Sequence, residues 1–547
     1  MKIALAQINF RVGDFEENAR KIIETIEKAR DKGADLAVFS ELAVTGYYPH
    51  DLLVMRDFVE KAEQTIRQIA KSCTGISALV GGPMINQSER GKMLYNAAWF
   101  LSEGMVKDVF FKTLLPTYNV FDEYRHFEPN REFKLLEFLG KKIAVTICED
   151  VWDEQPTAGQ FEKNRLYQVS PLEVLSKLNP DVAINLSSSP FSLHQENTRK
   201  SVLAGKARRF NLPLIYVNQT GANTEMIFDG GSMVLSPNGE IVHELKYFEE
   251  DFRVIDIANL CPPEIQEKKE AIEKIHDALV LGISDYFRKS GFPTATLGLS
   301  GGLDSAVVAV LAVRALGAAN VRGILMPSRY SSQHSIDDAV QLAENLDISY
   351  DIIPINLAVE SFEKRLEPLF AELKPDVTEE NIQSRTRGVF MMAVSNKFGN
   401  IVLNTSNKSE CAVGYGTLYG DMIGGLSVLG DVYKTDVYRL AAFINRQEEI
   451  IPLNTIAKPP SAELRPDQKD SDSLPAYDVL DRILYHYIEL NQSSVEIANL
   501  GYEPDFVEQI IRMVNRNEYK RAQMAPILRI SSKAFGFGRR MPVVAKY

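Results

Sequence analysis

The chain has 547 residues, of which 45% are hydrophobic and 24% charged, and it carries a formal net charge of −12 at pH 7. A chain of this length exceeds one ordinary hydrophobic core, so we expect about two to four domains. No segment reaches the roughly 18 uninterrupted apolar residues of a membrane span, and the negative charge disfavours a broad nucleic-acid surface, which needs clustered Lys and Arg. The composition therefore favours small-molecule substrates over nucleic-acid or membrane partners.

The N-terminal segment MKIALAQINF predicts a first strand, because Gln7 and Asn9 interrupt its apolar stretch and no small-residue cleavage site follows. We therefore expect a cytoplasmic protein. The cysteines are sparse and include no CxxC pair, which argues against a disulfide framework and against a zinc cluster. We expect reduced thiols at all four positions: Cys73, Cys148, Cys261 and Cys411.

From residue 1 to about residue 250, short β-rich runs alternate with helical ones, an order typical of a layered α/β domain. We predict a helix from Phe15 to about Lys32 and a second helix before residue 77. The predicted strands lie in the segments 2–10, 34–42, 77–83, 96–101, 141–150, 181–190, 213–221 and 230–242.

Pro262 and Pro263, followed by a charged run, interrupt any regular element around residues 259–271. We predict a linker there, between one domain over 1–258 and another over 272–547. An amphipathic helix from about Glu267 to Lys289 then leads into strands that alternate with helices. This order predicts a doubly wound parallel sheet, with ligands at the carboxyl ends of its strands. The predicted strands are 294–299, 321–327, 350–357 and 400–406.

Residues 455–475 combine prolines with many charges. This composition is compatible with a mobile active-site flap and equally with a plain solvated loop.

A glycine-rich turn, SGGLDS over Ser300–Ser305, joins the strand 294–299 to a helix. Gly301 and Gly302 allow the backbone N–H groups to turn toward one point, and the helix N-terminus adds its positive end, which suits phosphate oxygens. The turn lacks the lysine of the GxxxxGK[ST] loop and carries Asp304, which suits a magnesium ion. It resembles the pyrophosphatase loop of enzymes that split ATP into AMP and pyrophosphate, and its plainer alternative is a serine-capped glycine turn.

Further segments follow SGGLDS in a fixed order: TEENIQSRTRG, LNTSNKSE, GYGTLYGDMIGG and KPPSAEL. Together they resemble the successive motifs of NAD synthetases over nearly all of residues 270–547. That family adenylates the carboxylate of deamido-NAD with ATP and then displaces AMP with ammonia, which is the last step of NAD biosynthesis. Because charge concentrates in both steps, the chemistry needs magnesium, for which Asp304 and Glu410 are the expected ligands.

The resemblance implies roles for particular residues. ATP is expected at Gly298, Leu299, Ser300, Gly301, Gly302, Leu303, Asp304, Ser305 and Thr405, and deamido-NAD at Asn381, Glu410 and Lys533. Arg385, Asp421 and Lys434 also stand in matching motifs. The C-terminal run SSKAFGFGRRMPV is either a phosphate and base clamp or a basic tail packed on the core, and we favour a substrate contact for Lys533 alone.

In the first 250 residues, FSELAVTGY, FFKTLLPTYNVFDEYRHF and VTICEDVW resemble in order the three catalytic motifs of the nitrilase superfamily. The resemblance implies an αββα sandwich that hydrolyses glutamine, with Glu41, Lys112 and Cys148 as the catalytic residues. Cys148 would attack the amide carbon, Glu41 would act as general base, and Lys112 would favour the thiolate and stabilise the oxyanion. Taken singly, Cys148 would be a small core residue and Glu41 the end of a strand, but the ordered triple reverses that reading.

The same resemblance places glutamine at Tyr118, Ser189 and Gln195. Other glutaminase classes do not fit the sequence. None of the seven histidines stands in a recognisable cysteine partner motif, and Lys2 occupies the position that an N-terminal nucleophile would need.

The sequence as a whole resembles glutamine-dependent NAD synthetases: a nitrilase-like glutaminase that feeds ammonia to an ATP-dependent ligase. Passage of ammonia between the two sites, and assembly into homo-oligomers through synthetase-domain dimers, are hypotheses that the resemblance adds. Another pyrophosphatase-loop ligase is disfavoured, because GMP and asparagine synthetases carry different glutaminase domains. A non-catalytic nucleotide sensor is disfavoured, because it would need neither the thiol and its base nor two metal carboxylates.

Overall fold

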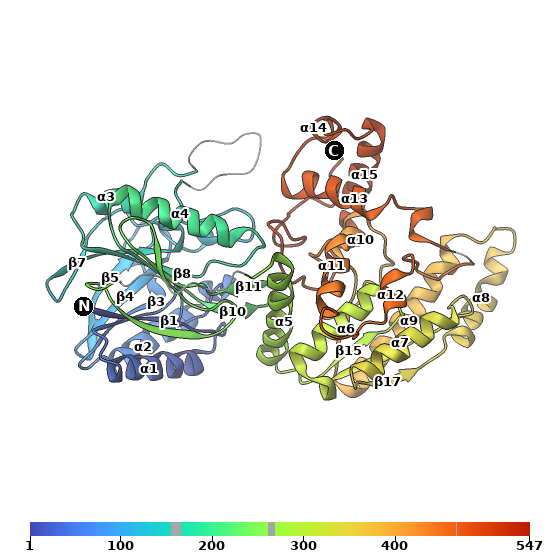
Figure 1. The fold of residues 1–547 in the computed structure, drawn as a ribbon, viewed down its shortest axis with the longest axis horizontal. Helices are drawn as coiled ribbons and strands as arrows, with labels where there is room; N and C mark the ends of the chain where they lie inside the picture. The colour runs from blue at the N-terminus through green and yellow to red at the C-terminus, as the bar shows by residue number, and fades with distance from the viewer. Residues whose placement is uncertain (155–165, 261–268, 467, 547) are drawn as a thin grey trace. The chain divides into compact units, whose positions relative to one another are not determined.

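The computed structural model describes residues 1–154, 166–260, 269–466 and 468–546, and it forms two compact units, Met1–Lys268 and Lys269–Tyr547 (Figure 1). Most of the predicted linker, together with Cys261 and Glu267, lies outside the described residues, so the linker and the domain limits stay predictions. Of the described thiols, Cys73, Cys148 and Cys411 are free.

Unit 1 contains two six-stranded sheets, each with three parallel strands at its centre. The first has the strand order β14-β1-β2-β3-β4-β5 and the second β13-β12-β9-β8-β7-β6. Their strands are β1 Lys2–Gln7, β2 Leu36–Val38, β3 Ser77–Ile85, β4 Leu94–Ser102, β5 Met105–Phe111, β6 Leu136–Phe138, β7 Lys141–Ile147, β8 Val182–Ser187, β9 Leu214–Asn218, β12 Met233–Leu235, β13 Ile241–Glu244 and β14 Asp251–Asp256; β10 Thr220–Asn223 and β11 Met226–Asp229 form a separate hairpin.

Helices cover the outer face of each sheet, and the inner faces pack on one another (Figure 1). Helices α1 (Phe15–Asp31) and α2 (Arg56–Ala70) lie on the first sheet, and α3 (Pro171–Ser176) and α4 (Gln195–Phe210) on the second. This arrangement confirms the predicted αββα sandwich. Strand β2 is shorter than the predicted segment 34–42, because the chain leaves the sheet after Val38 and turns toward Glu41.

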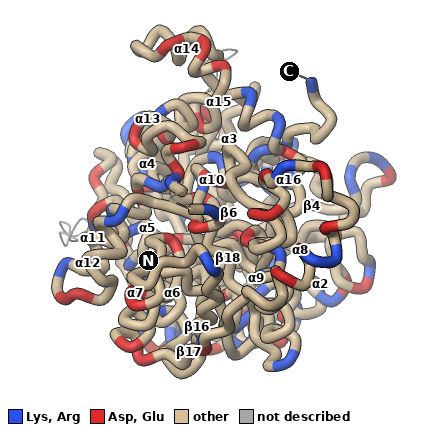
Figure 2. The backbone as a smooth tube through the Cα atoms, turned by 90° about the vertical axis from the view of Figure 1, so that its right-hand side faces the viewer, with Lys and Arg blue, Asp and Glu red and all other residues tan. Residues whose placement is uncertain are grey.

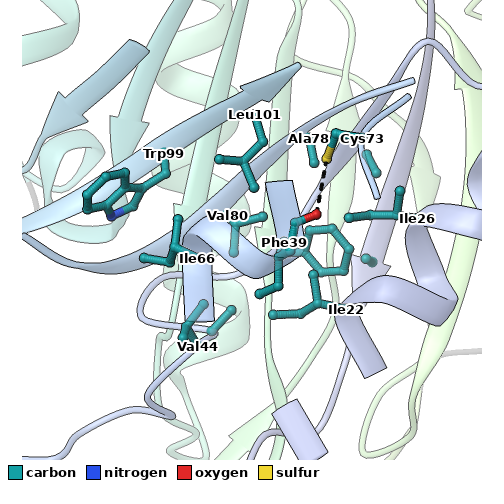
Figure 3. Close-up of a cluster of buried hydrophobic side chains, with 14 of the residues drawn as sticks. Ile22, Ile26, Phe39, Val44, Ile66, Cys73, Ala78, Val80, Trp99 and Leu101 are labelled. Carbon is teal, nitrogen blue, oxygen red and sulfur yellow. Dashed lines mark hydrogen bonds between the residues drawn. The ribbon is translucent and has the colours of Figure 1, made fainter. Parts of the chain in front are cut away.

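Apolar residues at helical spacing on α1 and α2 form a buried core against the first sheet (Figure 3). Ile22 and Ile26 are four residues apart on α1 and point to one side, as helical spacing requires. They belong to one buried cluster with the ring of Phe39 and the fully buried Cys73, whose thiol donates to the carbonyl of Ile69 at 3.9 Å. Burial raises the pKa of Cys73 to about 12, so this thiol stays protonated and behaves as a small core residue.

Unit 2 is built on one parallel sheet with the order β17-β16-β15-β18-β19. The chain starts in the middle, moves to one edge and returns to the other side, which confirms the predicted doubly wound sheet. The strands are β15 Ala295–Gly298, β16 Val321–Leu325, β17 Ser349–Ile352, β18 Ile401–Asn404 and β19 Leu426–Ser427. The predicted strand 350–357 ends early, because Pro354 cannot donate to a sheet and helix α8 begins at Asn356.

Helices surround this sheet and continue into a C-terminal helical group around the buried cluster that contains Leu480, Val507 and Val514. The first long helix begins at Ala271 rather than near Glu267. The helices are α5 Ala271–Ser290, α6 Leu303–Leu316, α7 Gln333–Asn345, α8 Asn356–Phe370, α9 Val377–Phe398, α10 Lys408–Val413, α11 Lys434–Ile444, α12 Leu453–Ala457, α13 Tyr477–Leu484, α14 Ser494–Ala498, α15 Pro504–Arg516 and α16 Glu518–Arg521.

Basic and acidic segments are interspersed along the backbone trace (Figure 2). Within the described ranges, no helix has both the length and the apolar character that a bilayer crossing requires.

Candidate active sites

The structure brings two of the three predicted glutaminase residues into direct contact and seats the third beside them. Each follows a strand: Glu41 comes after β2, Lys112 directly after β5, and Cys148 directly after β7. Glu41 and Lys112 are fully buried, and Cys148 is 4% exposed. The strands belong to both sheets, so the sandwich itself assembles the cluster.

Lys112 lies between two carboxylates. Its Nζ donates to Glu41 Oε1 at 2.7 Å and to Glu123 Oε1 at 2.8 Å, and no part of these side chains reaches solvent. Burial alone would lower the pKa of Lys112, but the charges of Glu123 and Glu41 raise it well above its ordinary value. Burial raises the pKa of Glu123 to about 7, against the lowering effect of Lys112. The lysine is thus held as a dry ammonium group.

Two further contacts orient the carboxylate of Glu41, and a third holds its backbone. Asn96 Nδ2 donates to Glu41 Oε1 at 2.7 Å, and the backbone N–H of Ser188 donates to Oε2 at 3.2 Å. The hydroxyl of Ser188 also donates to the carbonyl of Glu41 at 2.8 Å. The carboxylate therefore has one fixed position before any substrate arrives.

Cys148 stands at a sharp turn, where its φ of 40° is in the left-handed region that non-glycine residues rarely adopt. Asp150 supports this turn by accepting the N–H of Ile147 at 3.0 Å. Its other oxygen accepts the N–H groups of Thr113 and Leu114, the two residues after Lys112. Asp150 thereby fixes the nucleophile turn against the lysine loop, although burial raises its pKa to about 7.

The predicted effect of Lys112 on the thiol is present but outweighed. Burial, followed by the charge of Glu41, raises the pKa of Cys148 well above its ordinary value, whereas Lys112 acts in the lowering direction. The resting thiol is therefore protonated, because desolvation penalises the thiolate more than one shared ammonium stabilises it. Such a thiol needs a base to take its proton.

Two of the three predicted glutamine contacts, Tyr118 and Ser189, lie next to residues of this cluster, and the third, Gln195, has no hydrogen bond to it among the described residues. The Tyr118 hydroxyl donates to Glu149 Oε1 at 2.9 Å, which places it beside the residue after Cys148. Ser189 is buried directly after Ser188, and its N–H donates to an oxygen of Asn218 at 2.9 Å. Gln195 begins α4, and within the described residues no hydrogen bond joins its side chain to this cluster.

Sequence reasoning missed several polar residues of this site, among them Asn96, Glu123, Glu149, Asp150 and Ser188. Three of them stand inside the motifs that were recognised. Glu123 lies 11 residues after Lys112, and Glu149 and Asp150 directly follow Cys148. Acids next to a candidate nucleophile are a signal that could have found them.

The second site lies at the carboxyl ends of β15 and β18, where the strand order of the second sheet reverses. The glycine turn has the expected geometry: Gly301 has φ 76°, and a Cβ there would lie 2.1 Å from the carbonyl oxygen of Ser335. The Ser300 hydroxyl accepts the N–H of Gly302 at 3.1 Å, and the Ser305 hydroxyl donates to the carbonyl of Gly302 at 3.0 Å. Only glycine fits at 301.

A cavity of about 630 Å³ opens in front of this turn. Of the predicted ATP residues, Gly301 alone is absent from its wall, because its backbone faces Ser335 instead. The predicted residues that line the cavity are Gly298, Leu299, Ser300, Gly302, Leu303, Asp304, Ser305, Thr405 and Glu410.

Two carboxylates in this cavity share one cation. Lys434 Nζ contacts Asp304 Oδ2 and lies 3.9 Å from Glu410 Oε1, and Asn407 Nδ2 donates to Asp304 Oδ1 at 2.9 Å. Burial and the charge of Asp304 raise the pKa of Glu410 to about 8. Burial would lower the pKa of Lys434, but the two carboxylates raise it above its ordinary value.

These oxygens suit a magnesium ion, which takes one or two carboxylates and completes its shell with phosphate oxygens and water. The described residues include no group of three or more His, Cys, Asp or Glu that could hold a metal ion by itself. The donor set therefore fits magnesium only together with oxygens from a ligand.

The other two predicted deamido-NAD residues do not line the cavity. Asn381 Oδ1 accepts the hydroxyl of Thr417 at 2.7 Å, and Lys533 Nζ donates to Asn491 at 2.6 Å. The backbone of Lys533 is held by the buried Lys408, which donates to its carbonyl at 2.9 Å. Burial lowers the pKa of Lys533.

Much of the segment 455–475 forms a wall of the cavity, which favours an active-site segment over a plain solvated loop. Glu463 accepts the hydroxyls of Ser332 at 2.7 Å and Ser335 at 2.9 Å, and Lys458 pairs with Asp338 at 3.0 Å. Residue 467 of this segment lies outside the described part of the chain.

Comparison with known proteins gives a match to each half of the chain. The carbon-nitrogen hydrolase family model matches residues 2–269, and the NAD synthase family model matches residues 275–524. A glutamine-dependent NAD(+) synthetase of Synechocystis sp. is 45% identical over 100% of this chain and 99% of its own length, and one of Acinetobacter baylyi is 42% identical over 99% and 98%. The solved structure of a glutamine-dependent NAD+ synthetase from Acinetobacter baumannii in complex with ADP is 40% identical, with a TM-score of 0.78 over 99% of this chain and 98% of that one.

Proposed function

Because this chain belongs to the glutamine-dependent NAD(+) synthetase family, we propose that unit 1 hydrolyses glutamine and that unit 2 uses the ammonia and ATP to amidate deamido-NAD. The reaction makes it a carbon-nitrogen ligase. One observation carries the assignment of both halves: a single chain holds a buried acid, lysine and cysteine cluster and, separately, a cavity at a glycine-rich turn.

In unit 1 the reaction starts from a protonated thiol, since burial raises the pKa of Cys148. The Glu41 carboxylate takes the thiol proton as sulfur attacks the amide carbon of glutamine, and it passes that proton to the departing ammonia. The Lys112 ammonium stabilises the negative oxygen that forms on the carbonyl. Water, activated by Glu41, then hydrolyses the thioester and returns glutamate and the free thiol.

Glu123 supports this step from behind the lysine. With Glu41 it holds Lys112 Nζ at hydrogen-bond distance on two sides, so the ammonium cannot swing away from the reacting carbonyl. We assign glutamine contacts to Tyr118, Ser189 and Gln195 on the family resemblance, and the position of Tyr118 beside Glu149 supports the first of these.

In unit 2 the carboxylate of deamido-NAD attacks the α-phosphorus of ATP, pyrophosphate leaves, and ammonia then displaces AMP from the acyl adenylate. The backbone N–H groups of the glycine turn and the N-terminus of α6 attract the phosphate oxygens. Asp304 and Glu410 would hold magnesium, which when bound neutralises phosphate charge. Lys434, fixed against Asp304, adds a second positive charge at the same end of the cavity.

Four further features belong to the same proposal. We propose that the enzyme is cytoplasmic. We also propose that ammonia passes to the second site without release, because it would be protonated and unreactive in bulk water. Asn381 and Lys533 would bind the part of deamido-NAD that extends outside the ATP cavity. Homo-oligomers through the synthetase unit are supported by large apolar side chains exposed on α8 and α9: Leu357, Phe362, Leu369, Val377, Val389 and Phe398.

The test compares NAD formation from deamido-NAD, ATP and magnesium by the wild type and Cys148→Ala, each with glutamine or with ammonium. We expect the variant to fail with glutamine and to work with ammonium, because only unit 1 needs the thiol. A wild type that makes no NAD from either nitrogen source would refute the synthetase assignment. Equal glutamine use by the variant would refute the role of Cys148.

A further inference from the structure

Arg387 is a cation in the wall of the nucleotide cavity to which the steps above give no role. It lies on α9 together with Ser384, Gly388 and Met391, and all four side chains or Cα positions line the cavity. The spacing of i, i+3, i+4 and i+7 places them on one face of the helix. This face of α9 is therefore directed at the bound ligand.

One hydrogen bond fixes the guanidinium at the end of a strand. Arg387 Nε donates to the carbonyl of Met326 at 3.1 Å, directly after β16. The neighbouring parallel strand β15 ends at Gly298, where an added Cβ would lie 3.6 Å from Met326 Cε. The arginine thus stands one strand away from the phosphate-binding turn.

The rest of the guanidinium has no hydrogen-bond or ion-pair partner among the described residues. Within the part of the chain that the structure describes, Arg387 forms no ion pair, and Met326 supplies its one hydrogen-bond acceptor. Burial lowers its pKa to about 10, and the charges of Asp421 and Glu463, which also line the cavity, act in the raising direction. Arg387 is half-buried, and a cation that is partly removed from water without a pairing carboxylate adds nothing to the stability of a fold. Stability therefore does not account for Arg387, whereas an anionic ligand does.

We propose that Arg387 binds the α-phosphoryl group of the adenine nucleotide. The planar fork of a guanidinium matches two phosphate oxygens, and with Nε fixed on Met326 its terminal amino groups are available for that contact. The β- and γ-phosphoryl groups belong at the glycine turn and the N-terminus of α6, one strand away. The α-phosphoryl is also the one phosphoryl group that ATP, the acyl adenylate and AMP share, so a single contact serves every state of the reaction.

This inference rests on the proposed function, since it takes the cavity as the ATP site. The test is isothermal titration of the full-length protein with ATP, AMP and adenosine. The variants are Arg387→Gln and Arg387→Lys, and the control is Arg439→Gln, an exposed arginine of α11 that pairs with Asp436. We expect Arg387→Gln to weaken AMP and ATP binding by about tenfold to a hundredfold, as the loss of a charge-assisted hydrogen bond predicts.

Adenosine binding should change by less than about twofold in Arg387→Gln, because adenosine lacks the group that the arginine binds. Arg387→Lys should give an intermediate loss, since it keeps the charge without the fork. The melting temperature of ligand-free Arg387→Gln should not fall, because the variant removes a half-buried charge that has no carboxylate partner among the described residues.

Unchanged AMP affinity in Arg387→Gln, or an equal loss for adenosine, would overturn the inference. A lower melting temperature with a uniform loss for all three ligands would overturn it too, since that is the signature of a structural anchor. A wild type that binds none of the three ligands would instead overturn the proposed function of unit 2.

Discussion

The two candidate sites hold their charges in opposite ways. In unit 1 the ammonium of Lys112 is paired with Glu41 and Glu123 and is fully buried. In unit 2 Arg387 lines a cavity of about 630 Å³ and forms no ion pair with any described residue, and Asp304 and Glu410 share the ammonium of Lys434. The first site is complete before its substrate arrives, whereas the second has charges that a ligand must balance.

This difference follows the substrates. The amide of glutamine is neutral and gains charge only in the transition state, so a prefixed ammonium and carboxylate act on the reaction rather than on binding. ATP brings several negative charges with it, and a site that had already paired all its cations would gain little from binding them. The site in unit 1 is therefore organised for charge that develops on the substrate during the reaction, and the site in unit 2 for charge that the substrate already carries when it binds.

The largest effect should come from removing the ammonium of Lys112 in unit 1, which tests the difference between the two sites most directly. We expect Lys112→Met to lower the glutamine-dependent rate by about 10²- to 10³-fold, the usual cost of losing one oxyanion stabiliser. NAD formation from ammonium should persist, because unit 2 keeps its own residues. Both rates are measured in steady state.

Lys107→Met is the matched control, since Lys107 lies on the same strand β5 and pairs with the exposed Glu103. Loss of one partner from a buried ion pair costs about 3–5 kcal/mol, so melting temperatures are recorded with the rates. Near wild-type use of glutamine by a folded Lys112→Met protein would contradict the comparison.

The second prediction tests whether the charges of unit 2 are unbalanced without ligand. Burial and Asp304 raise the pKa of Glu410 from 4.5 to about 8. Between those values the native state holds a proton that the unfolded chain has released, so this group makes the native state progressively less stable as pH rises through that window. Glu410→Gln cannot ionise. We expect its melting temperature to match the wild type near pH 5 and to exceed it at pH 8, without magnesium or nucleotide.

Glu508→Gln, an exposed change on α15, should melt like the wild type at both pH values. Identical melting temperatures of Glu410→Gln and the wild type from pH 5 to pH 8 would contradict the prediction, because they would mean that nearby cations already compensate the ionised Glu410 carboxylate.

The smallest expected effect separates two buried thiols. Cys73 and Cys148 both have pKa values raised by burial, but only Cys148 stands at a strained turn beside a carboxylate and an ammonium. We expect Cys73→Ala to cost about 1 kcal/mol in urea unfolding, as for a small deletion from a packed core, and to leave both activities unchanged. Loss of glutamine hydrolysis by a folded Cys73→Ala protein would mean that the strained turn and the charged neighbours of Cys148 do not by themselves set it apart from Cys73.

Much of the fold and of the site was predictable from local pattern. The αββα sandwich and the doubly wound sheet follow from the alternation of strands and helices, and helix α1 ends within one residue of the predicted limit. Glu41, Lys112, Cys148 and the glycine turn were found because each stands in a motif at the end of a strand. The segment 350–357 is predicted as one strand because its apolar residues continue past Pro354. The strand itself cannot continue there, because proline has no N–H to donate to a neighbouring strand.

The sequence by itself determined the order of the elements, the glycine at 301 and the positions of the reactive groups along the chain, because these depend on spacing and on backbone sterics. Only the tertiary structure decided that Glu123 pairs with Lys112, that Cys148 is a protonated thiol, and that Arg387 faces the cavity with no carboxylate partner in the described part of the chain. The physical reason is the same for all three. The charge state and the ion pairs of a side chain depend on its burial and on neighbours that are distant in the sequence. Local sequence determines neither the burial nor those neighbours.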